Sequence, residues 1–528
     1  MRDVSRQLER SDRGASRRPL AYKWVVLVNT TIGVLMASID SSIVTIALPD
    51  ITRTLRVSVA EMMWIVMGYS LVITSALLPI ARLADMKGRV RLYSVGFAIF
   101  TAASALCGFS RSGLELVVFR LVQGAGAAFL FANGTALVTD AFPPSERGFA
   151  LGVNLTVGVS GFLLGTVLGG VVTHFLGWRY IFFLNLPFGI FATMWTYTTL
   201  YEIVPPERTP RFDIGGMVTF PLGMAAILAG LTEVVMGRAS DLLPRALFVC
   251  GVAMLLAFFL IERRAPEPMM DLGLFRIRLF LAGNLSLFLN ALSRGATMFV
   301  MSWYFQAVRK DTPLAAGWKL MPWALAMMAL SPLAGRLSDR FGSRGISTAG
   351  LIVVCGSQLR MTRIPINIRY GSLGLALAAL GAGHGIFNSP NTSAVMGSVP
   401  ANRRGVAAGT RTLLNNSGQT LAIALAMVVL STVMSYRVLS DLFAGSGSVR
   451  PSLNGLEFMR GFHELFALSA LITIAAIACS SLRGREDRGG ALLTAGNVET
   501  EEGDTGRGHR VAGSAYDPRL RTRARPGG

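Results

Sequence analysis

Charged residues are scarce in this chain: they make up 15% of its 528 residues, whereas soluble proteins carry about a quarter. Polar runs are short except at the two ends, and the stretches between them are long and apolar. A helix needs about 20 apolar residues to cross a bilayer, so the pattern excludes an ordinary soluble domain and predicts a polytopic helical membrane protein. A transmembrane β-barrel would instead show alternating polarity within segments of about ten residues.

Cysteine is also rare, and catalytic and nucleotide-binding motifs are missing. The four cysteines fall in apolar segments without CxxC or Cys/His spacing, which argues against disulfides and against a metal site. The sequence has no GxxxxGK[ST] phosphate loop, so ATP is not the expected energy source. It has no nucleophile elbow either. We therefore expect neither an enzyme nor a bound cofactor.

The formal net charge is +20, and the arginines gather at both ends and in short loops. Positive charge in these places holds segments on the cytoplasmic side and attracts anionic lipid, so we predict lipid contact and no nucleic-acid partner. We interpret residues 1–23 and 483–528 as cytoplasmic tails, the second of them disordered. One exterior loop conflicts with this orientation, because it carries Arg360, Arg363 and Arg369.

The hydropathy pattern predicts fourteen spans, and an even number places both termini on one side of the membrane. The expected spans are 24–48, 61–81, 91–110, 113–138, 148–173, 180–201, 214–236, 244–262, 280–306, 314–335, 346–361, 370–397, 405–433 and 461–481.

Motifs recur in the two halves of the chain. RLADMKG at 82–88 matches RLSDRFG at 336–342, and other motifs repeat in the same order with an offset of about 255 residues. Parallel repeats of this kind form two-lobed transporters with the substrate site between the lobes, near the membrane midplane. We predict an N-terminal six-helix lobe at 24–201, two linker helices with flanking loops at 202–279, and a C-terminal six-helix lobe at 280–482.

Asp40 lies roughly 24 Å inside the first apolar segment, at a helical rise of 1.5 Å per residue. A carboxylate at that depth costs at least ~2.5 kcal/mol, so we expect it to have a use. Because low-dielectric surroundings favour the neutral form of an acid, reversible proton binding is the expected use, with protons as the coupling ion. The structural alternative is a hydrogen bond to a neighbouring helix, helped by the serines of SIDSS.

Five segments in sequence order resemble signatures of the Major Facilitator Superfamily, and specifically of its fourteen-span drug:proton antiporter branch. They are IDSSIVTIALPDI at 39–51, ARLADMKGRVR at 81–91, FRLVQGAGAAFLFANGTALVTDAFPPSERG at 119–148, GVSGFLLGTVLGG at 158–170 and GWRYIFFLNLP at 177–187. The resemblance covers roughly residues 24–481. It implies an all-α integral membrane protein with the major facilitator fold: two six-helix lobes plus two inserted linker helices.

The resemblance also implies roles for charged residues. Asp40 stands on the acidic position of the first signature, and Arg120 corresponds to the intramembrane arginine implicated in proton transfer. An arginine roughly 10 Å inside a span must pair, line a cavity or snorkel outward. The loop of the second signature would gate between lobe conformations, or act only as a topology signal. Its residues are Asp85, Lys87, Gly88, Arg89 and Arg91, with Gly335, Asp339 and Gly342 in the second copy.

Small residues dominate one face of the fifth span. Gly161, Gly165 and Gly169 recur every four residues and, with Gly170, give a smooth surface for another helix. This stretch resembles the antiporter motif of the branch, although packing alone would explain the glycines equally well. Thr166 stands where the family has proline, which removes the usual helix bend.

Two polar residues deep in the second half match no family motif. Arg294 is near the middle of the ninth span and His384 near the middle of the twelfth. Each could line a central cavity, where histidine could titrate and arginine could select anionic or polar substrates. The alternative is a contact between helices. Aromatic and methionine side chains that could add apolar recognition include Met298, Trp303 and Tyr304.

The sequence thus predicts a monomeric secondary exporter of the cytoplasmic membrane that exchanges inward protons for a small amphiphilic drug or antibiotic. Export of an endogenous metabolite, lipid or siderophore is an open alternative. A membrane-embedded enzyme or receptor is a remote one, since the duplicated gating loops and the missing catalytic cluster argue against it.

Overall fold

The computed structural model describes residues 19–143, 146–203, 213–265, 270–400, 403–436, 438–439 and 451–484. Within these ranges each of the fourteen expected spans coincides with helix. Most of the two expected tails, 1–23 and 483–528, lies outside the described residues.

The first half of the chain contributes a run of closely connected helices. They are α2 (Pro19–Leu55), α3 (Val59–Lys87), α4 (Arg89–Phe109), α5 (Gly113–Ala141), α6 (Arg147–Phe175), α7 (Arg179–Phe183) and α8 (Asn185–Thr199). The middle segment holds α9 (Ile214–Glu233), the π-helical turn η1 (Val234–Arg238), α10 (Leu242–Glu262) and the 3-10 turn η2 (Leu272–Arg276).

The second half follows the same plan. Its elements are α11 (Arg278–Trp303), the π-helical turn η3 (Tyr304–Val308), α12 (Pro313–Phe341), α13 (Ser343–Met361), α14 (Tyr370–Gly397), α15 (Arg404–Val433) and α17 (Pro451–Ser481).

The sixth expected span is divided in two at Leu184, between α7 and α8. Pro187 has no backbone N–H to donate to the carbonyl of Phe183, four residues earlier, so the helical ladder loses a bond at this point. The last helix begins at Pro451, ten residues before the predicted start at 461. Proline is favoured at the first position of a helix, where its N–H is not needed.

Eleven helices in the described residues are long and apolar enough to cross a membrane. The helix α11 is not among them, because its sequence carries Asn284, Asn290 and Ser293. These three side chains are buried against other helices. By contrast, α10 exposes large apolar side chains such as Phe248, Val249 and Leu256. Exposed apolar surface on this scale is expected where a helix faces lipid.

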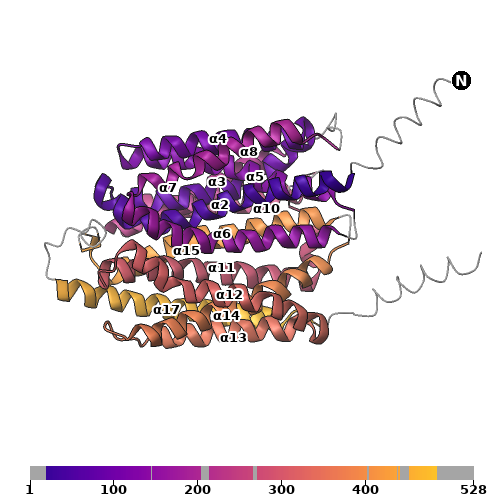
Figure 1. Cartoon of the computed structure of the whole chain (residues 1–528). Coiled ribbons are helices and arrows are strands. Elements are labelled where there is room, and N and C mark those ends of the chain that lie inside the picture. The colour runs from indigo at the N-terminus through magenta and orange to yellow at the C-terminus, as the bar shows by residue number, and fades with distance from the viewer. Residues whose placement is uncertain are drawn as a thin grey trace, which may run out of the picture. The chain divides into compact units, whose positions relative to one another are not determined.

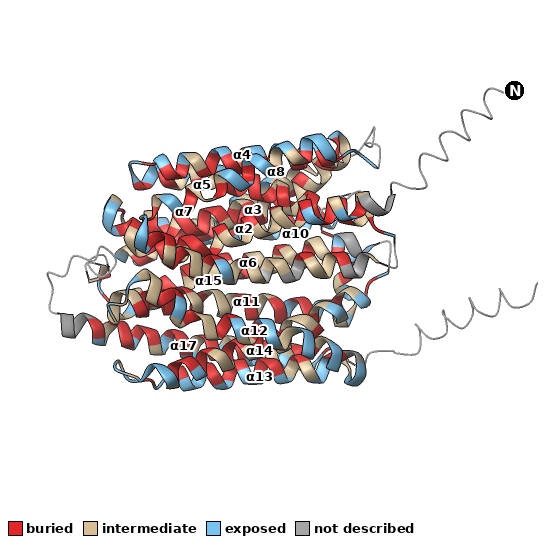
Figure 2. Ribbon diagram, viewed as in Figure 1, coloured by how far each residue is buried: buried red, intermediate tan, exposed pale blue. Residues whose placement is uncertain are grey.

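The helices lie side by side, with α4 and α8 at the upper edge of Figure 1 and α13 and α14 at the lower edge. Figure 2 shows that buried positions dominate the inner helices such as α2 and α3, while α13 carries many exposed ones. The two halves meet where α6 packs against α12 and α3 packs against α15. The linker helices α9 and α10 pack together, and α9 contacts both α3 and α15.

Residues through Gly484 form a single compact unit, so the division into two lobes remains a prediction of the repeat. For brevity we call α2–α8 the first helix group and α11–α17 the second. Hydrogen bonds join the groups: Ser302 Oγ donates to the Thr45 carbonyl at 3.3 Å, Gln306 Nε2 donates to the Ile46 carbonyl at 3.1 Å, and Ser160 Oγ donates to Met328 Sδ at 3.7 Å.

The two repeated loops have the same backbone geometry. Gly88 ends α3 with φ of +99°, and Gly342 ends α12 with φ of +91°. Residues other than glycine rarely adopt a positive φ of this size. The glycine therefore turns the chain sharply enough for the next helix to start at the following residue. Arg89 and Ser343 are accordingly the first residues of α4 and α13.

The glycine face of α6 packs against α2. A Cβ atom added at Gly165 would lie 2.5 Å from the Ile39 carbonyl oxygen and closer still to Ser42 Oγ. At Gly169 it would lie 2.9 Å from the Ile43 carbonyl oxygen. The backbones therefore approach as closely as small-residue interfaces allow, which fixes α2 against α6.

Replacing Gly165 by alanine should weaken this contact, because the new methyl group must displace the backbone of α2. Overpacking of this kind costs about 1–3 kcal/mol. The measurement is thermal unfolding of the purified protein in detergent. Gly152→Ala on the same helix is the matched control, since a Cβ there meets no heavy atom within 4 Å. Equal melting temperatures for the two variants would contradict the packing described here.

Candidate functional site

The sequence-predicted residues Asp40 and Arg120 meet in the interior of the first helix group. Arg120 Nη1 on α5 lies 2.5 Å from Asp40 Oδ2 on α2. The side chain of Asp40 is 0% exposed and that of Arg120 is 1% exposed. A charge buried this completely needs an opposite partner, and each of these residues supplies the other's.

Amide side chains complete the coordination of the carboxylate. Gln123 Nε2 and Asn185 Nδ2 donate to Asp40 Oδ1 at 2.9 and 3.0 Å. The same two nitrogens also lie 3.0 Å from Ser104 Oγ, which accepts from both. Asp40 therefore has three donors drawn from α5 and α8, and Ser104 on α4 links the two amides.

The guanidinium of Arg120 is held on its other sides as well. Its Nε donates to the Ile65 carbonyl at 3.2 Å, and its Nη1 also donates to Gln123 Oε1 at 2.7 Å. The guanidinium carbon lies 3.9 Å from the ring centroid of Tyr69, a cation–π geometry. Tyr69 in turn donates its hydroxyl to the Ala37 carbonyl at 3.3 Å, one turn before Asp40.

This network is electrically neutral and sealed from solvent in the conformation described. The three donors and the arginine charge satisfy the buried carboxylate of Asp40. Protonating it would remove the charge that balances Arg120.

Sequence reasoning did not single out Gln123, Asn185, Ser104 or Tyr69. A signal existed for two of them, because Gln123 follows Arg120 by one helical turn in FRLVQGAG and Asn185 falls within the FFLNLP signature. Ser104 and Tyr69 have no such signal, since their role depends on how α3 and α4 pack against α5.

The loop between α3 and α4 forms a second charge network at the helix ends. Arg89 Nη2 donates to Asp85 Oδ1 at 2.8 Å, and Arg89 Nη1 donates to Asp140 Oδ2 at 2.6 Å. Glu202, beyond the end of α8, accepts backbone N–H bonds from Arg89, Val90 and Arg91 at 2.9–3.2 Å. A carboxylate is well placed there, because the start of a helix carries unpaired N–H groups and partial positive charge.

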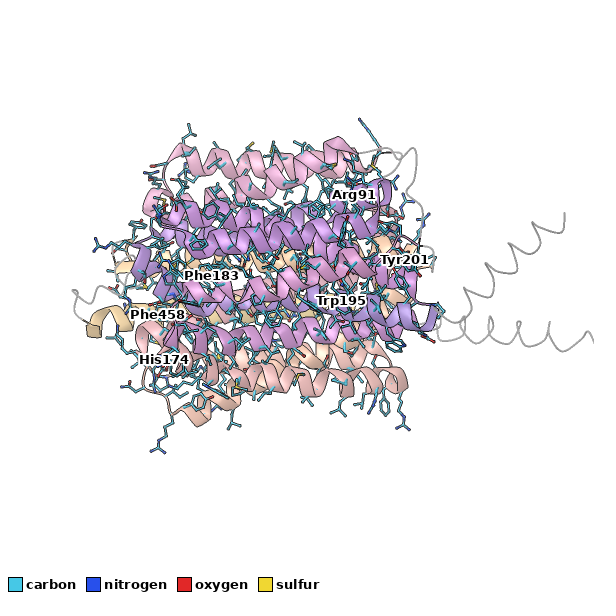
Figure 3. All side chains as sticks on the ribbon, turned by 45° about the horizontal axis from the view of Figure 1, so that its top comes forward. Arg91, His174, Phe183, Trp195, Tyr201 and Phe458 are labelled. Carbon is cyan, nitrogen blue, oxygen red and sulfur yellow. The ribbon has the colours of Figure 1, made fainter. Side chains whose placement is uncertain are left out.

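The remaining loop residues lie at the same end of the bundle. Lys87 and Arg91 have exposed side chains, and Figure 3 shows Arg91 and Tyr201 near one end, with His174 and Phe458 near the other. In the second copy, a Cβ at Gly335 would lie 2.9 Å from Ser389 Oγ. The side chain of Asp339 lies outside the described residues.

A narrow cavity of about 30 Å³ lies between the two helix groups. That is room for one or two water molecules. Its lining from the first group includes Thr45, Phe162 and Thr166, and its lining from the second includes Met298 and Trp323. Thr166, the position without proline, belongs to an α6 that continues unbroken, and its hydroxyl donates to the Phe162 carbonyl at 3.0 Å.

The candidate cavity residues are distributed unevenly around this space. Met298 lines it, whereas Trp303 and Tyr304 are buried in the core of the second group and are not among its lining residues. Tyr304 donates its hydroxyl to the Ile366 carbonyl at 3.1 Å. His384 is fully buried and accepts at Nδ1 from Nε1 of Trp323 at 3.2 Å, so it lies directly behind a lining residue.

Gly170, the last residue of the glycine motif, faces the second helix group. A Cβ there would lie 2.6 Å from the carbonyl oxygen of Pro313 on α12. On the other side of this contact, a Cβ at Gly317 would lie 2.9 Å from the Thr166 carbonyl oxygen. The motif therefore contacts both α2 and the opposite half of the protein.

Comparison with known proteins places these features in a family. The family model described as "Major Facilitator Superfamily" matches residues 30–216 and 283–496. The chain is 32% identical over 389 residues to the riboflavin transporter RibZ of Clostridioides difficile strain 630, with 73% of this chain and 83% of that protein covered. It is 31% identical to the tetracenomycin C resistance and export protein of Streptomyces glaucescens, covering 80% of this chain and 77% of that protein.

One further relative and one solved structure also match this chain. The multidrug resistance protein Stp of Mycobacterium tuberculosis H37Rv is 32% identical, with 78% of this chain and 76% of that protein covered. Among solved structures, a bacterial homologue of the human lysosomal transporter Spinster, in an inward-facing and unoccupied conformation, gives a TM-score of 0.62 at 17% identity. That match covers 88% of this chain and 97% of the other. The chain therefore belongs to the Major Facilitator Superfamily and is a multi-pass membrane transporter rather than an enzyme.

Proposed function

We propose that this transporter exports small amphiphilic drugs or antibiotics across the cytoplasmic membrane in exchange for protons. The observation that carries the proposal is the buried Asp40–Arg120 pair, whose two charges lie in a solvent-excluded network. An isolated charge in this position would be costly, and a neutral pair that can be opened by one proton offers a coupling step. Two relatives named for drug or antibiotic resistance and export support the choice of substrate and direction.

In the proposed cycle a proton from outside binds an oxygen of Asp40 and so cancels its charge. Arg120 then keeps its bonds to Gln123 and the Ile65 carbonyl but loses its ion pair. The unbalanced arginine makes that conformation less favourable, and rearrangement of the helix groups relieves the imbalance. When the pair forms again, the proton leaves to the cytoplasm, and substrate moves in the opposite direction. In this cycle the loop around Arg89 changes its contacts as the groups move.

The proposed topology has both termini in the cytoplasm. The strongly basic tails favour it, because positively charged segments near the membrane tend to remain inside. The loop of Asp85 and Arg89 would then face the cytoplasm, and the Ser302–Thr45 hydrogen bond would join the groups on the outer side.

Transport of an endogenous metabolite is a second candidate function. It is favoured by the relative named as a riboflavin transporter, which is as similar to this chain as the drug exporters are. A substrate panel in cells separates the two candidates, since a drug exporter should lower accumulation of several unrelated amphiphiles and a metabolite transporter should act on one chemical class.

Asp40→Asn should abolish proton-driven efflux, because the amide cannot exchange a proton. The same change leaves the Arg120 charge unpaired, which should destabilise the fold by about 3–5 kcal/mol. The double variant Asp40→Asn, Arg120→Gln removes both charges, so its melting temperature should recover while its efflux stays absent. Thermal unfolding and dye efflux are measured on both. Proton-dependent efflux by the double variant would remove the pair from the coupling mechanism.

Arg120→Ala should impair transport more than Arg120→Lys, and both should be slower than the unmodified protein. Lysine can still balance Asp40, but it cannot also keep the bonds to Gln123 and the Ile65 carbonyl. Efflux rates at matched expression give the comparison. If the alanine variant transports normally, Arg120 is a structural residue only.

An imposed pH gradient should drive dye accumulation in inverted membrane vesicles, and added substrate should release protons in exchange. Both effects should disappear when an uncoupler collapses the gradient, and vesicles that carry the Asp40→Asn, Arg120→Gln variant should show neither. Accumulation that survives the uncoupler, or that requires ATP, would show that the coupling proposed here is wrong.

A further inference from the structure

The two helix groups differ in how their deep charges are balanced. In the first group the arginine at position 120 has a carboxylate partner. In the second group Arg294 on α11 and Arg411 on α15 have neutral partners: Arg294 Nη2 donates to Asn415 Oδ1 at 3.4 Å, and Arg411 Nη2 donates to Thr392 Oγ1 at 2.5 Å. In the described part of the chain, no carboxylate oxygen lies within 4.0 Å of either guanidinium.

The sequence explains this imbalance. The described helices α11, α12, α13, α14, α15 and α17 contain only three acidic residues, Asp339, Glu457 and Glu464. Asp339 is in the last turn of α12. Glu464 is exposed, and its neighbour His463 contacts the Ile364 carbonyl in the loop after α13, at the far end of the bundle. The middle of the second group therefore carries positive charge without an internal anion.

Arg294, Arg411 and His384 lie on helices that pack against one another. Arg294 donates to Asn415, one helical turn beyond Arg411 on α15, and Arg411 donates to Thr392 on α14, the helix that carries His384. Two positive charges whose hydrogen-bond partners are neutral repel each other. A bound anion would offset this repulsion.

The unsatisfied atoms of the cluster are hydrogen-bond donors. Because His384 Nδ1 accepts from Trp323, the neutral ring carries its proton on Nε2, and this N–H has no partner in the structure. Arg411 Nε is likewise buried without a partner. These two donors lack acceptors, and the oxygens of an anionic group would satisfy them.

The cluster also adjoins the cavity between the helix groups. Met298 lines the cavity and lies one helical turn beyond Arg294 on the same face of α11. Trp323, which lines the cavity from α12, is the residue that donates to His384. Arg294 and Arg411 are only partly buried, so neither is sealed within helix contacts. The ring centroids of Phe162 and Trp323, which both line the cavity, are 5.9 Å apart. The cavity therefore offers aromatic surface beside positive charge.

We propose that Arg294, Arg411 and His384 bind the carboxylate, phosphate or sulfonate group of the transported substrate, while Phe162 and Trp323 contact its aromatic body. The substrate class is therefore an aromatic organic anion, and organic cations are disfavoured by the two arginines. This inference rests on the transport function proposed above and specifies its substrate class.

The test is equilibrium binding of two dyes with one xanthene body to the purified full-length protein in nanodiscs, measured by fluorescence polarisation. Fluorescein is anionic, and rhodamine 6G is cationic. The unmodified protein should bind fluorescein at least tenfold more tightly than rhodamine 6G. Arg294→Gln and Arg411→Gln should each weaken fluorescein binding tenfold or more, and His384→Phe should weaken it less.

Matched controls separate charge from folding. Arg294→Lys keeps the charge and should retain most of the fluorescein affinity, whereas Arg460→Gln removes an exposed arginine of α17 and should change nothing. Thermal unfolding identifies any variant that has lost its fold. The proposal is overturned if fluorescein binds no better than rhodamine 6G, or if the glutamine variants bind fluorescein as tightly as the unmodified protein.

Binding at equilibrium requires no proton gradient, so this test and the coupling test can fail separately. Gradient-driven efflux of cationic dyes without fluorescein binding would reject the anion site alone. Arginine-dependent fluorescein binding, with transport that ignores the gradient, would support the anion site and reject the proton coupling.

Discussion

The ion pair between Asp40 and Arg120 constrains most of the first helix group. Because neither charge is solvated, each needs the other and a full set of hydrogen bonds. The residues that meet this need come from five helices: α2, α3, α4, α5 and α8. A shift of any one of these helices would leave a charge or an amide without a partner, so the network also holds their relative positions.

The helix that carries Asp40, α2, makes two different kinds of contact. One side of α2 enters the charge network, and the opposite side packs against the glycine face that contains Gly161, Gly165 and Gly169. The same α6 continues to the second helix group through Gly170 and lines the inter-group cavity at Thr166. Because α6 contacts α2 directly, movement at the cavity can reach Asp40 through packed backbone rather than through flexible side chains.

The two halves repeat their turns but not their charges. Gly88 and Gly342 adopt matching conformations and start the next helix in the same way. Asp40 and Arg120 have no counterpart pair in the described residues of the second half, where Arg294 and Arg411 stand without a carboxylate. In the proposed mechanism, one half binds the proton and the other binds the charged end of the substrate, and the cavity lies between the two.

Much of this protein follows from its sequence alone. In a bilayer, the backbone N–H and C=O groups of a long apolar segment find partners within a helix. Each of the fourteen segments predicted from hydropathy coincides with helix in the described residues. The repeated RLADMKG-type loops and the cost of a buried carboxylate are also visible in the residues, so the sequence points to Asp40, to Arg120 and to the family. Some helix boundaries differ from the predicted ones because of local backbone chemistry. The sixth predicted span, for example, is divided at Leu184, shortly before Pro187.

What only the tertiary structure decided is which polar groups meet. Apart from Gln123 and Arg120, which lie one helical turn apart, the partners in the Asp40 network are separated by 19 to 145 residues, and sequence spacing alone does not specify such contacts. Arg411 stands as far inside α15 as Arg120 does inside α5, but its lack of a carboxylate partner depends on how the helices pack together. Hydropathy reports the solvent that each segment prefers, whereas hydrogen bonds and ion pairs depend on distances that arise only when the helices assemble.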